Sequence, residues 1–299
     1  MPLMRHFLQM EESLMKFTEI RKGKKGKTHV IPGFGLSMGI TLFMLSVIVI
    51  IPLASVLMYS FQLTPREYFD LITKTNVVNA LKTSIICSFI SALINSVFGL
   101  ILAWVLVRYE FPGKRIMDGL IELPFALPTA VAGITLSKLY SSTGSMGRFF
   151  GLFGIKVAYT KLGLTIALIF IGIPFVVRAV QPVLESLDPR YEEAAYILGA
   201  DRFFTFRKVI LPELSPALLT GFGLAFARGV GEYGSVIYIS GNNARDQTQV
   251  VSYVIMQKLN YVDYPGATAI ALVLLVISFA VLLFVNMVQV KQARRTSCV

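Results

Sequence analysis

The chain is poor in the residues that build metal centres, disulfide frameworks and hydrolytic sites. It contains two cysteines, Cys87 inside an apolar run and Cys298 near its end, and two histidines. Cysteines so placed suit neither a disulfide framework nor a zinc site. No paired carboxylates or metal-ligating cluster can be placed on one helical face. The composition therefore argues against an enzyme, and we predict that the chain has no catalytic residue and binds no metal.

Charged residues are also scarce. They make up 15% of the 299 residues, whereas 55% are hydrophobic, and the mean hydropathy is +0.68. This composition excludes an ordinary soluble domain. Six apolar runs are each about 20 residues or longer, enough to cross a bilayer. They lie at 36–60, 80–107, 116–140, 162–182, 215–240 and 267–290. The sequence thus predicts an all-α polytopic membrane protein with about six transmembrane helices.

The net charge of +11 is unevenly distributed along the chain. With the N-terminus inside, the segments expected in the cytoplasm hold eighteen basic residues and the outer segments nine. Arg178 is counted with the cytoplasmic loop after the fourth span, and Arg228 with neither side. The densest run, at 21–27, could be a nucleic-acid arm, but a positive-inside flank explains it better. We therefore expect both termini in the cytoplasm and no nucleic-acid partner.

A short sequence in the basic run imitates a phosphate-binding loop. Gly26, Lys27 and Thr28 match its last positions, but Arg21 stands where the first glycine is needed and no strand precedes it. A GxGxxG pattern at 229–234 likewise lacks the strand and turn of a dinucleotide site. Its glycines are expected instead to let helices approach or the backbone open. No cofactor is expected in this chain.

A polar segment after the fourth span predicts two short helices joined at a glycine. Asp188 and Asp201 can cap the two helices, and Gly199 suits the left-handed residue that ends the first. Pro212 and Pro216 are expected to end the second before the next apolar block. The result is a compact helical knob with small residues, which predicts a plug for a groove on another protein.

The third span is expected to be broken. It carries Pro124, Pro128 and Gly133, so its backbone cannot form an uninterrupted helix. Broken backbone is tolerated in lipid only where protein or a water-filled cavity satisfies it. These three residues are therefore candidates for lining a substrate path. The alternative is a proline kink packed on a neighbouring helix.

The fifth span contains two ionisable residues, Arg228 and Glu232, spaced four apart on one helical face. Even scales based on insertion experiments assign about 3 kcal/mol to an arginine at the membrane centre. Arg228 could present a positive, hydrogen-bonding surface to an anion, with Glu232 holding it in place. Alternatively, the two residues merely neutralise each other. Both hypotheses stay open at this stage.

The knob resembles the EAA signature of permease subunits in bacterial ATP-binding-cassette importers. It has Glu193, Ala194 and Ala195, then three residues, Gly199, nine residues, and the tetrapeptide at 209–212 with valine where isoleucine is commoner. The resemblance implies a cytoplasmic coupling helix that docks into a cleft on an ATPase subunit. The residues it assigns to this coupling are Glu192, Glu193, Ala194, Ala195, Gly199, Ala200, Leu211 and Pro212.

Longer stretches resemble the sulfate/thiosulfate importer permeases, and within them the T-type subunit. These stretches are RYEFPGKR, ELPFALPTAVAGITL, IPFVVRAVQPVLESL, LPELSPALLTGFGLAFARGVGEYGSVIYISGN and DYPGATAIA. The resemblance covers roughly residues 31–290. It implies sulfate import, and thiosulfate with it. Molybdate/tungstate permeases are similar around LPFALPTAVAG and GEYG and remain the alternative.

This resemblance also implies the assembly and the layout of the chain. A W-type permease, two copies of an ATPase that hold ATP and Mg, and an extracytoplasmic sulfate-binding protein would join it in the bacterial inner membrane. The layout is a basic extension at 1–30, a permease domain at 31–290 with a coupling loop at about 183–216, and a tail at 291–299. An ion-coupled secondary transporter would be expected to carry more intramembrane carboxylates or histidines. Both His6 and His29 lie outside the expected spans.

Overall fold

The computed structural model describes residues 34–296, and this part of the chain is helical, without strands. Its contacts divide the chain into two compact units, Met1–Ala54 and Ser55–Val299. The expected extension at 1–30 lies outside the described residues. The expected tail is described only as far as Thr296, as the end of the last helix.

The first unit contributes most of an apolar helix of 27 residues, Phe34–Ser60. The helix consists of α2 (Phe34–Leu45), a π-helical turn η1 (Ser46–Ile50) and α3 (Ile51–Ser60). No residue of α2 is buried within the structure, although its side chains are mostly apolar. An exposed apolar surface of this length suits a helix surrounded by hydrocarbon. The first expected span is therefore confirmed.

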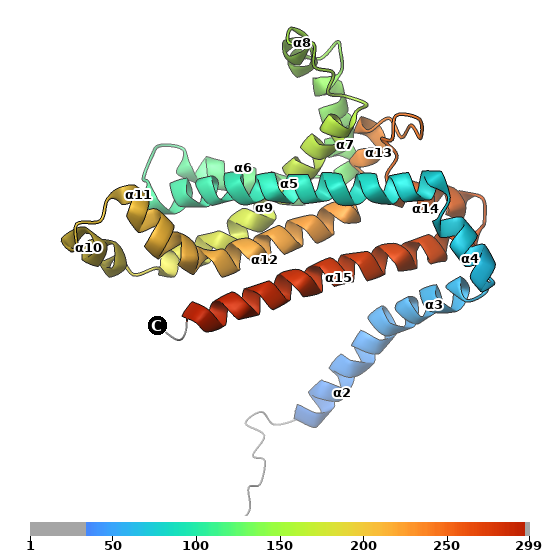
Figure 1. Cartoon of the computed structure of the whole chain (residues 1–299), viewed down its shortest axis with the longest axis horizontal. Helices are drawn as coiled ribbons and strands as arrows, with labels where there is room; N and C mark the ends of the chain where they lie inside the picture. The colour runs from blue at the N-terminus through green and yellow to red at the C-terminus, as the bar shows by residue number, and fades with distance from the viewer. Residues whose placement is uncertain (1–33, 297–299) are drawn as a thin grey trace, which may run out of the picture. The chain divides into compact units, whose positions relative to one another are not determined.

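Three long helices form the centre of the second unit. They are α5 (Thr75–Arg108), α9 (Lys161–Ser186) and α12 (Leu211–Val230), which lie side by side, with α15 (Tyr264–Thr296) along α12 (Figure 1). Most side chains buried among these helices are apolar, and Val176, Val180 and Phe226 belong to this core. α5 also buries polar side chains, among them Ser88 and Asn95. A helix group whose interior and outer surface are both apolar is typical of a membrane domain.

Glycines allow the central helices to approach closely. A Cβ built on Gly172 of α9 would lie 2.3 Å from Asn95 Nδ2 of α5, and one on Gly99 would lie 2.7 Å from Val176 Cγ1. Such contacts between small residues are the usual way in which helices associate in lipid. Outward apolar side chains on α5, including Ile86 and Leu93, remain more than half exposed.

The third expected span is broken, as predicted. α6 (Lys114–Ala126) and α7 (Thr129–Tyr140) meet at an angle of 110°. The break lies at Leu127, which has extended backbone, and Pro128, whose ψ of 130° is also not helical. Pro124 lies inside α6 without ending it. Five helices are long and apolar enough to cross a membrane in the described part of the chain, and counting this bent pair makes six.

The fifth span differs from the prediction at both ends. Its helix begins at Arg202, because α11 (Arg202–Thr205) and a π-helical turn η2 (Phe206–Ile210) lead directly into α12. Pro212 directly follows the π-helical turn, near the beginning of α12, and Pro216 lies inside α12. The expectation that these prolines end the helix was therefore wrong. The helix stops at Val230 rather than near residue 240, and a turn leads to α13 (Val236–Ile239).

Short helices connect the long ones. They are α4 (Pro65–Ile72), α8 (Ser145–Gly151), α10 (Arg190–Ile197) and α14 (Val251–Asn260). α10 and α11 lie at one end of α12, and α13 follows its other end (Figure 1). α14 packs against α15 and α5. The two ends of α12 therefore carry the two groups of residues that the sequence marks as functional.

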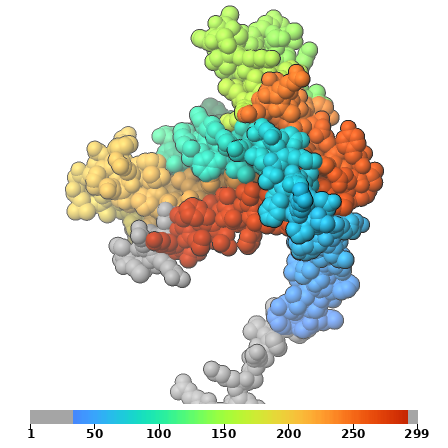
Figure 2. Space-filling model, turned by 45° about the vertical axis from the view of Figure 1, so that its right-hand side comes forward, coloured from blue at the N-terminus to red at the C-terminus, as the bar shows by residue number. Residues whose placement is uncertain are grey.

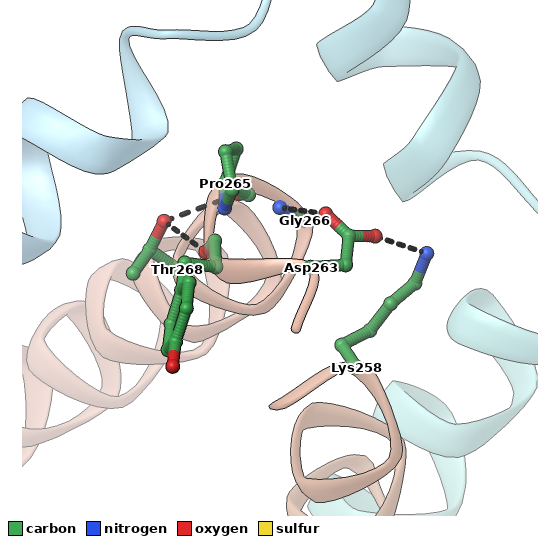
Figure 3. Close-up of polar contacts among 6 residues, drawn as sticks. Lys258, Asp263, Pro265, Gly266 and Thr268 are labelled. Atoms are coloured by element: carbon green, nitrogen blue, oxygen red, sulfur yellow. Dashed lines mark hydrogen bonds and ion pairs between the residues drawn. The ribbon is translucent and has the colours of Figure 1, made fainter. Parts of the chain in front are cut away.

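Asp263 fixes the turn between α14 and α15 (Figure 3). Its Oδ1 accepts a hydrogen bond from the Gly266 N–H at 2.9 Å, and its Oδ2 accepts one from Lys258 Nζ at 2.7 Å. The hydrogen bond from the Lys258 ammonium lowers the pKa of the Asp263 carboxyl below its ordinary value of 3.8 and outweighs the opposing effect of burial, and the Gly266 N–H lowers the pKa by a smaller amount. The stabilisation is present above pH 3.8 and is lost as the pH falls through the lowered pKa.

Replacing Asp263 with alanine is expected to destabilise the fold by about 1 kcal/mol, because the first turn of α15 loses its cap. Asp263→Asn keeps an oxygen for the Gly266 N–H and loses only the partly exposed ion pair with Lys258, so it should cost less than about 1 kcal/mol. Thermal unfolding of the two variants at neutral pH measures the difference. Equal losses would mean that the ion pair, rather than the cap, stabilises this turn.

Candidate functional site

The knob, residues 188–216, begins with α10 and α11, and local hydrogen bonds hold the starts of both helices. Asp188 Oδ1 accepts the Arg190 N–H at 2.9 Å, and α10 then begins with two acidic residues in its first turn, where the helix dipole favours them. Asp201 Oδ1 accepts the Phe204 N–H at 2.6 Å at the start of α11. Asp201 therefore caps α11, as the sequence predicted, whereas the N-cap of α10 is Pro189 and Asp188 lies one residue before it.

Gly199 separates the two helices, with a φ of +82°. The Gly199 N–H donates to Tyr196 O at 2.9 Å and the Ala200 N–H to Ala195 O at 3.0 Å. This pair of bonds closes the end of α10 in the way that a left-handed residue permits. The predicted role of Gly199 as a helix terminator is confirmed.

The knob exposes large apolar side chains beside its charged ones. Ile197 and Leu198 each expose 86% of their surface, and the knob protrudes from the end of the second unit (Figure 2). A cavity of about 600 Å³ is lined by Tyr191, Ala194, Ala195, Leu198, Gly199, Ala200, Asp201, Phe204 and Val209. An exposed apolar patch of this kind marks an interaction site. The knob therefore combines a protruding tip with a hollow, whereas the sequence suggested a simple plug.

The candidate coupling residues divide between this surface and the interior. Glu193 and Ala194 are exposed on α10, and Ala195 is buried. Glu192 is mostly buried and forms an ion pair with Arg108 at the end of α5, with Nη2 to Oε1 at 2.6 Å. Gly199 and Ala200 follow the end of α10, and Leu211 and Pro212 begin α12 directly after η2.

The second group of candidates lies at the opposite end of α12. At 1.5 Å per residue, Arg228 is about 25 Å along the helix from Leu211, in its last turn. Arg228 Nη1 contacts Glu232 Oε2 at 2.8 Å. The Arg228 side chain is 38% exposed and the Glu232 side chain 1%. The arginine is thus accessible, whereas its acidic partner is enclosed.

Glu232 also organises the turn that follows α12. Its Oε1 accepts hydrogen bonds from the Ser235 N–H at 3.0 Å and from Ser235 Oγ at 3.2 Å. Its backbone carbonyl accepts one from Ser252 Oγ of α14 at 2.9 Å. A buried carboxylate is stable only with such a set of partners. Glu232 therefore holds Arg228 with one oxygen and the turn at 231–235 with the other.

This turn is wedged against α7. A Cβ on Gly133 would lie 2.3 Å from Ser235 O, and one on Gly234 would lie 2.2 Å from Thr129 Oγ1. The structure thus brings Gly133 next to the turn that Glu232 holds. Pro128 stands at the break just before α7. Pro124 is buried in α6, which packs on α9.

A third cluster of charges was missed by sequence reasoning. Arg178 lies inside α9, not in the loop after it, and contacts two acidic residues of α6. Its Nη1 lies 3.0 Å from Asp118 Oδ1, and its Nη2 lies 2.7 Å from Glu122 Oε1. The available signal was the fourth apolar run itself, because residue 178 lies within the expected span at 162–182.

Comparison with known proteins identifies similar sequences along most of the chain. The family described as binding-protein-dependent transport system inner membrane component matches residues 95–297. The sulfate transport system permease protein CysT of Salmonella typhimurium is 50% identical over 267 residues, which cover 89% of this chain and 96% of the relative. The protein of the same description from Synechocystis is 44% identical over 250 residues, covering 84% and 87%.

Solved structures show the same fold at low identity. In the crystal structure of a bacterial alginate ABC transporter in complex with alginate pentasaccharide-bound periplasmic protein, one chain matches with a TM-score of 0.71 and 18% identity. The match covers 84% of this chain and 92% of that chain. A chain of the inward-facing MetNI methionine ABC transporter matches with a TM-score of 0.53 and 17% identity. The fold expected from the sequence is therefore confirmed.

Proposed function

Because this chain belongs to the family of binding-protein-dependent transport system inner membrane components, we propose that it is the permease subunit of an ATP-driven importer that moves sulfate and thiosulfate into the cytoplasm. The identity shared with the Salmonella sulfate permease over nearly the whole relative carries this proposal. In this proposal the chain forms part of the anion path and transmits movement from the ATPase to the membrane spans, and ATP hydrolysis occurs on a partner.

The proposed assembly contains this chain, a W-type permease, two ATPase subunits and an extracytoplasmic sulfate-binding protein. It lies in the bacterial inner membrane with the knob and both termini in the cytoplasm, in line with the excess of basic residues in those segments. The knob supports the ATPase contact, because it presents an exposed apolar surface with a hollow. ATP and Mg²⁺ bind to the ATPase.

An energy source is required by the charge of the substrate. Moving an anion inward against a negative-inside potential costs about 2.3 kcal/mol per charge for each 100 mV. A passive pore would let a divalent anion leak outward, so concentrative uptake needs a coupled energy source, and in this proposal the source is ATP hydrolysis by the partner. In the substrate path, we propose that Arg228 contacts the anion and that Glu232 positions Arg228, while the break at Pro128 and the close contact at Gly133 shape the path beside them.

Reconstitution tests the proposal directly. The chain, the W-type permease, the ATPase and the binding protein are placed in liposomes, and uptake of labelled sulfate is measured with and without ATP. We expect ATP-dependent uptake that unlabelled thiosulfate inhibits more strongly than molybdate or tungstate does. Stronger inhibition by molybdate would transfer the substrate assignment to that anion. Uptake without ATP would overturn the importer assignment.

Changing Gly199 tests the knob. Gly199→Val is expected to strain the end of α10 by roughly 1 kcal/mol, because an L residue with a side chain rarely adopts the observed positive φ. No atom lies within 4 Å of a Cβ at this position, so the strain is in the backbone alone. The variant should bind the ATPase more weakly in co-purification. Gly199→Asn is the matched control, because asparagine tolerates this conformation, and equal losses in both variants would contradict the explanation.

A further inference from the structure

Two adjacent glutamates of α10 have different surroundings. Glu193 is exposed, whereas 27% of the Glu192 side chain is exposed. The Glu192 carboxylate is turned toward α5 and engages Arg108 at 2.6 Å. The EAA resemblance assigns both residues to coupling, but their geometry separates them.

Arg108 connects three elements at the end of α5. Its guanidinium lies 5.5 Å from the centre of the Trp104 ring, one helical turn earlier. Trp104 in turn meets the edge of Phe206 in η2, with ring centroids 5.5 Å apart. The Arg108 side chain is only 23% exposed. An arginine held by an aromatic face and a carboxylate has a fixed orientation, so α10, α5 and η2 meet in one packed cluster.

Such a cluster can pass movement from the knob into a membrane span. Displacing α10 alone would separate two opposite charges that are largely shielded from water, which is unfavourable. Moving α5 together with α10 keeps the pair intact. We propose that Glu192 is a positioning residue that transmits movement of α10 to α5 through Arg108, and that it does not contact the ATPase. This inference rests on the proposed function.

A charge swap tests the pair. Glu192→Arg, Arg108→Glu and the double variant are reconstituted as complete importers, with Glu193→Arg as the matched control on the adjacent, exposed position. Three quantities are measured: co-purification of the ATPase, ATP hydrolysis, and sulfate taken up per ATP hydrolysed. If the pair served folding alone, the variants would lower the yield of complex but leave the sulfate taken up per ATP hydrolysed unchanged. Glu192→Gln supplies a milder single variant if Arg108→Glu fails to assemble.

Each single change at the pair is expected to leave the ATPase bound and hydrolysing while sulfate per ATP falls about fivefold or more. The double variant should recover at least half of the loss in sulfate taken up per ATP hydrolysed, because positions 108 and 192 again carry opposite charges that attract each other. Glu193→Arg should instead release the ATPase. If the swap is no better than the singles, or Glu192→Gln releases the ATPase, the inference is overturned. A wild-type chain that binds no ATPase would overturn the proposed function, and the inference with it.

Discussion

Replacing Arg228 with glutamine is expected to lower ATP-dependent sulfate uptake roughly tenfold or more while the complex still assembles. Arg228 is partly exposed in the last turn of α12, and among the described contacts Glu232 engages only its Nη1. The other guanidinium donors therefore remain available for a divalent anion, which accepts strong charge-assisted hydrogen bonds. Glutamine keeps hydrogen-bonding capacity but removes the charge. Initial rates of labelled sulfate uptake in liposomes measure the effect.

Arg245→Gln provides the matched control for Arg228→Gln. Arg245 is an exposed arginine of the loop after α13, so the same substitution removes the same charge away from α12. We expect uptake within about twofold of wild type, because isolated surface charges contribute little. Normal uptake by Arg228→Gln would make Arg228 a structural partner of Glu232. Equal losses in both variants would indicate a general effect of net charge.

The knob could be predicted from the sequence because its structure is determined locally. An aspartate cap acts within three residues, and a left-handed glycine ends a helix wherever it stands. Asp201 and Gly199 therefore have the predicted conformations. The prediction failed at Pro212 and Pro216, because α11 continues through a π-helical turn into α12 and both prolines lie within the continuous helix. Composition favours a helix end there but does not require one.

The break after Val230 could not be predicted in the same way. Gly231 and Gly234 permit a turn, but the turn forms because Glu232 accepts two hydrogen bonds from Ser235 and because Gly234 lies against Thr129 of α7. Thr129 is distant in sequence from Gly234, and Ser235 can reach Glu232 only when the turn has formed. The same holds for Arg178, whose acidic partners lie on α6. Long-range pairs of this kind leave no local pattern.

The contact at Gly133 makes a strong prediction about the path. Gly133→Ala is expected to destabilise the complex by roughly 2 kcal/mol, the usual cost of overpacking a filled interior. The added Cβ would lie 2.3 Å from Ser235 O and 2.6 Å from Ser235 Cα, and backbone atoms cannot move aside as a flexible side chain can. α7 must therefore separate from the turn that Glu232 holds. Sulfate uptake should fall along with the midpoint of thermal unfolding.

Gly119→Ala is the control that isolates this contact from helix propensity. Gly119 lies in α6, in the other half of the same broken span, and no atom lies within 4 Å of its Cβ position. Alanine should be tolerated there or stabilise by up to about 1 kcal/mol, because it favours the helix more than glycine does. Opposite effects of one substitution on the two halves would locate the constraint at the junction of α7 and the turn. If Gly133→Ala were also tolerated, α7 could move away from the turn at 231–235 without cost. The contact between Gly133 and Ser235 would then not be needed to shape the path.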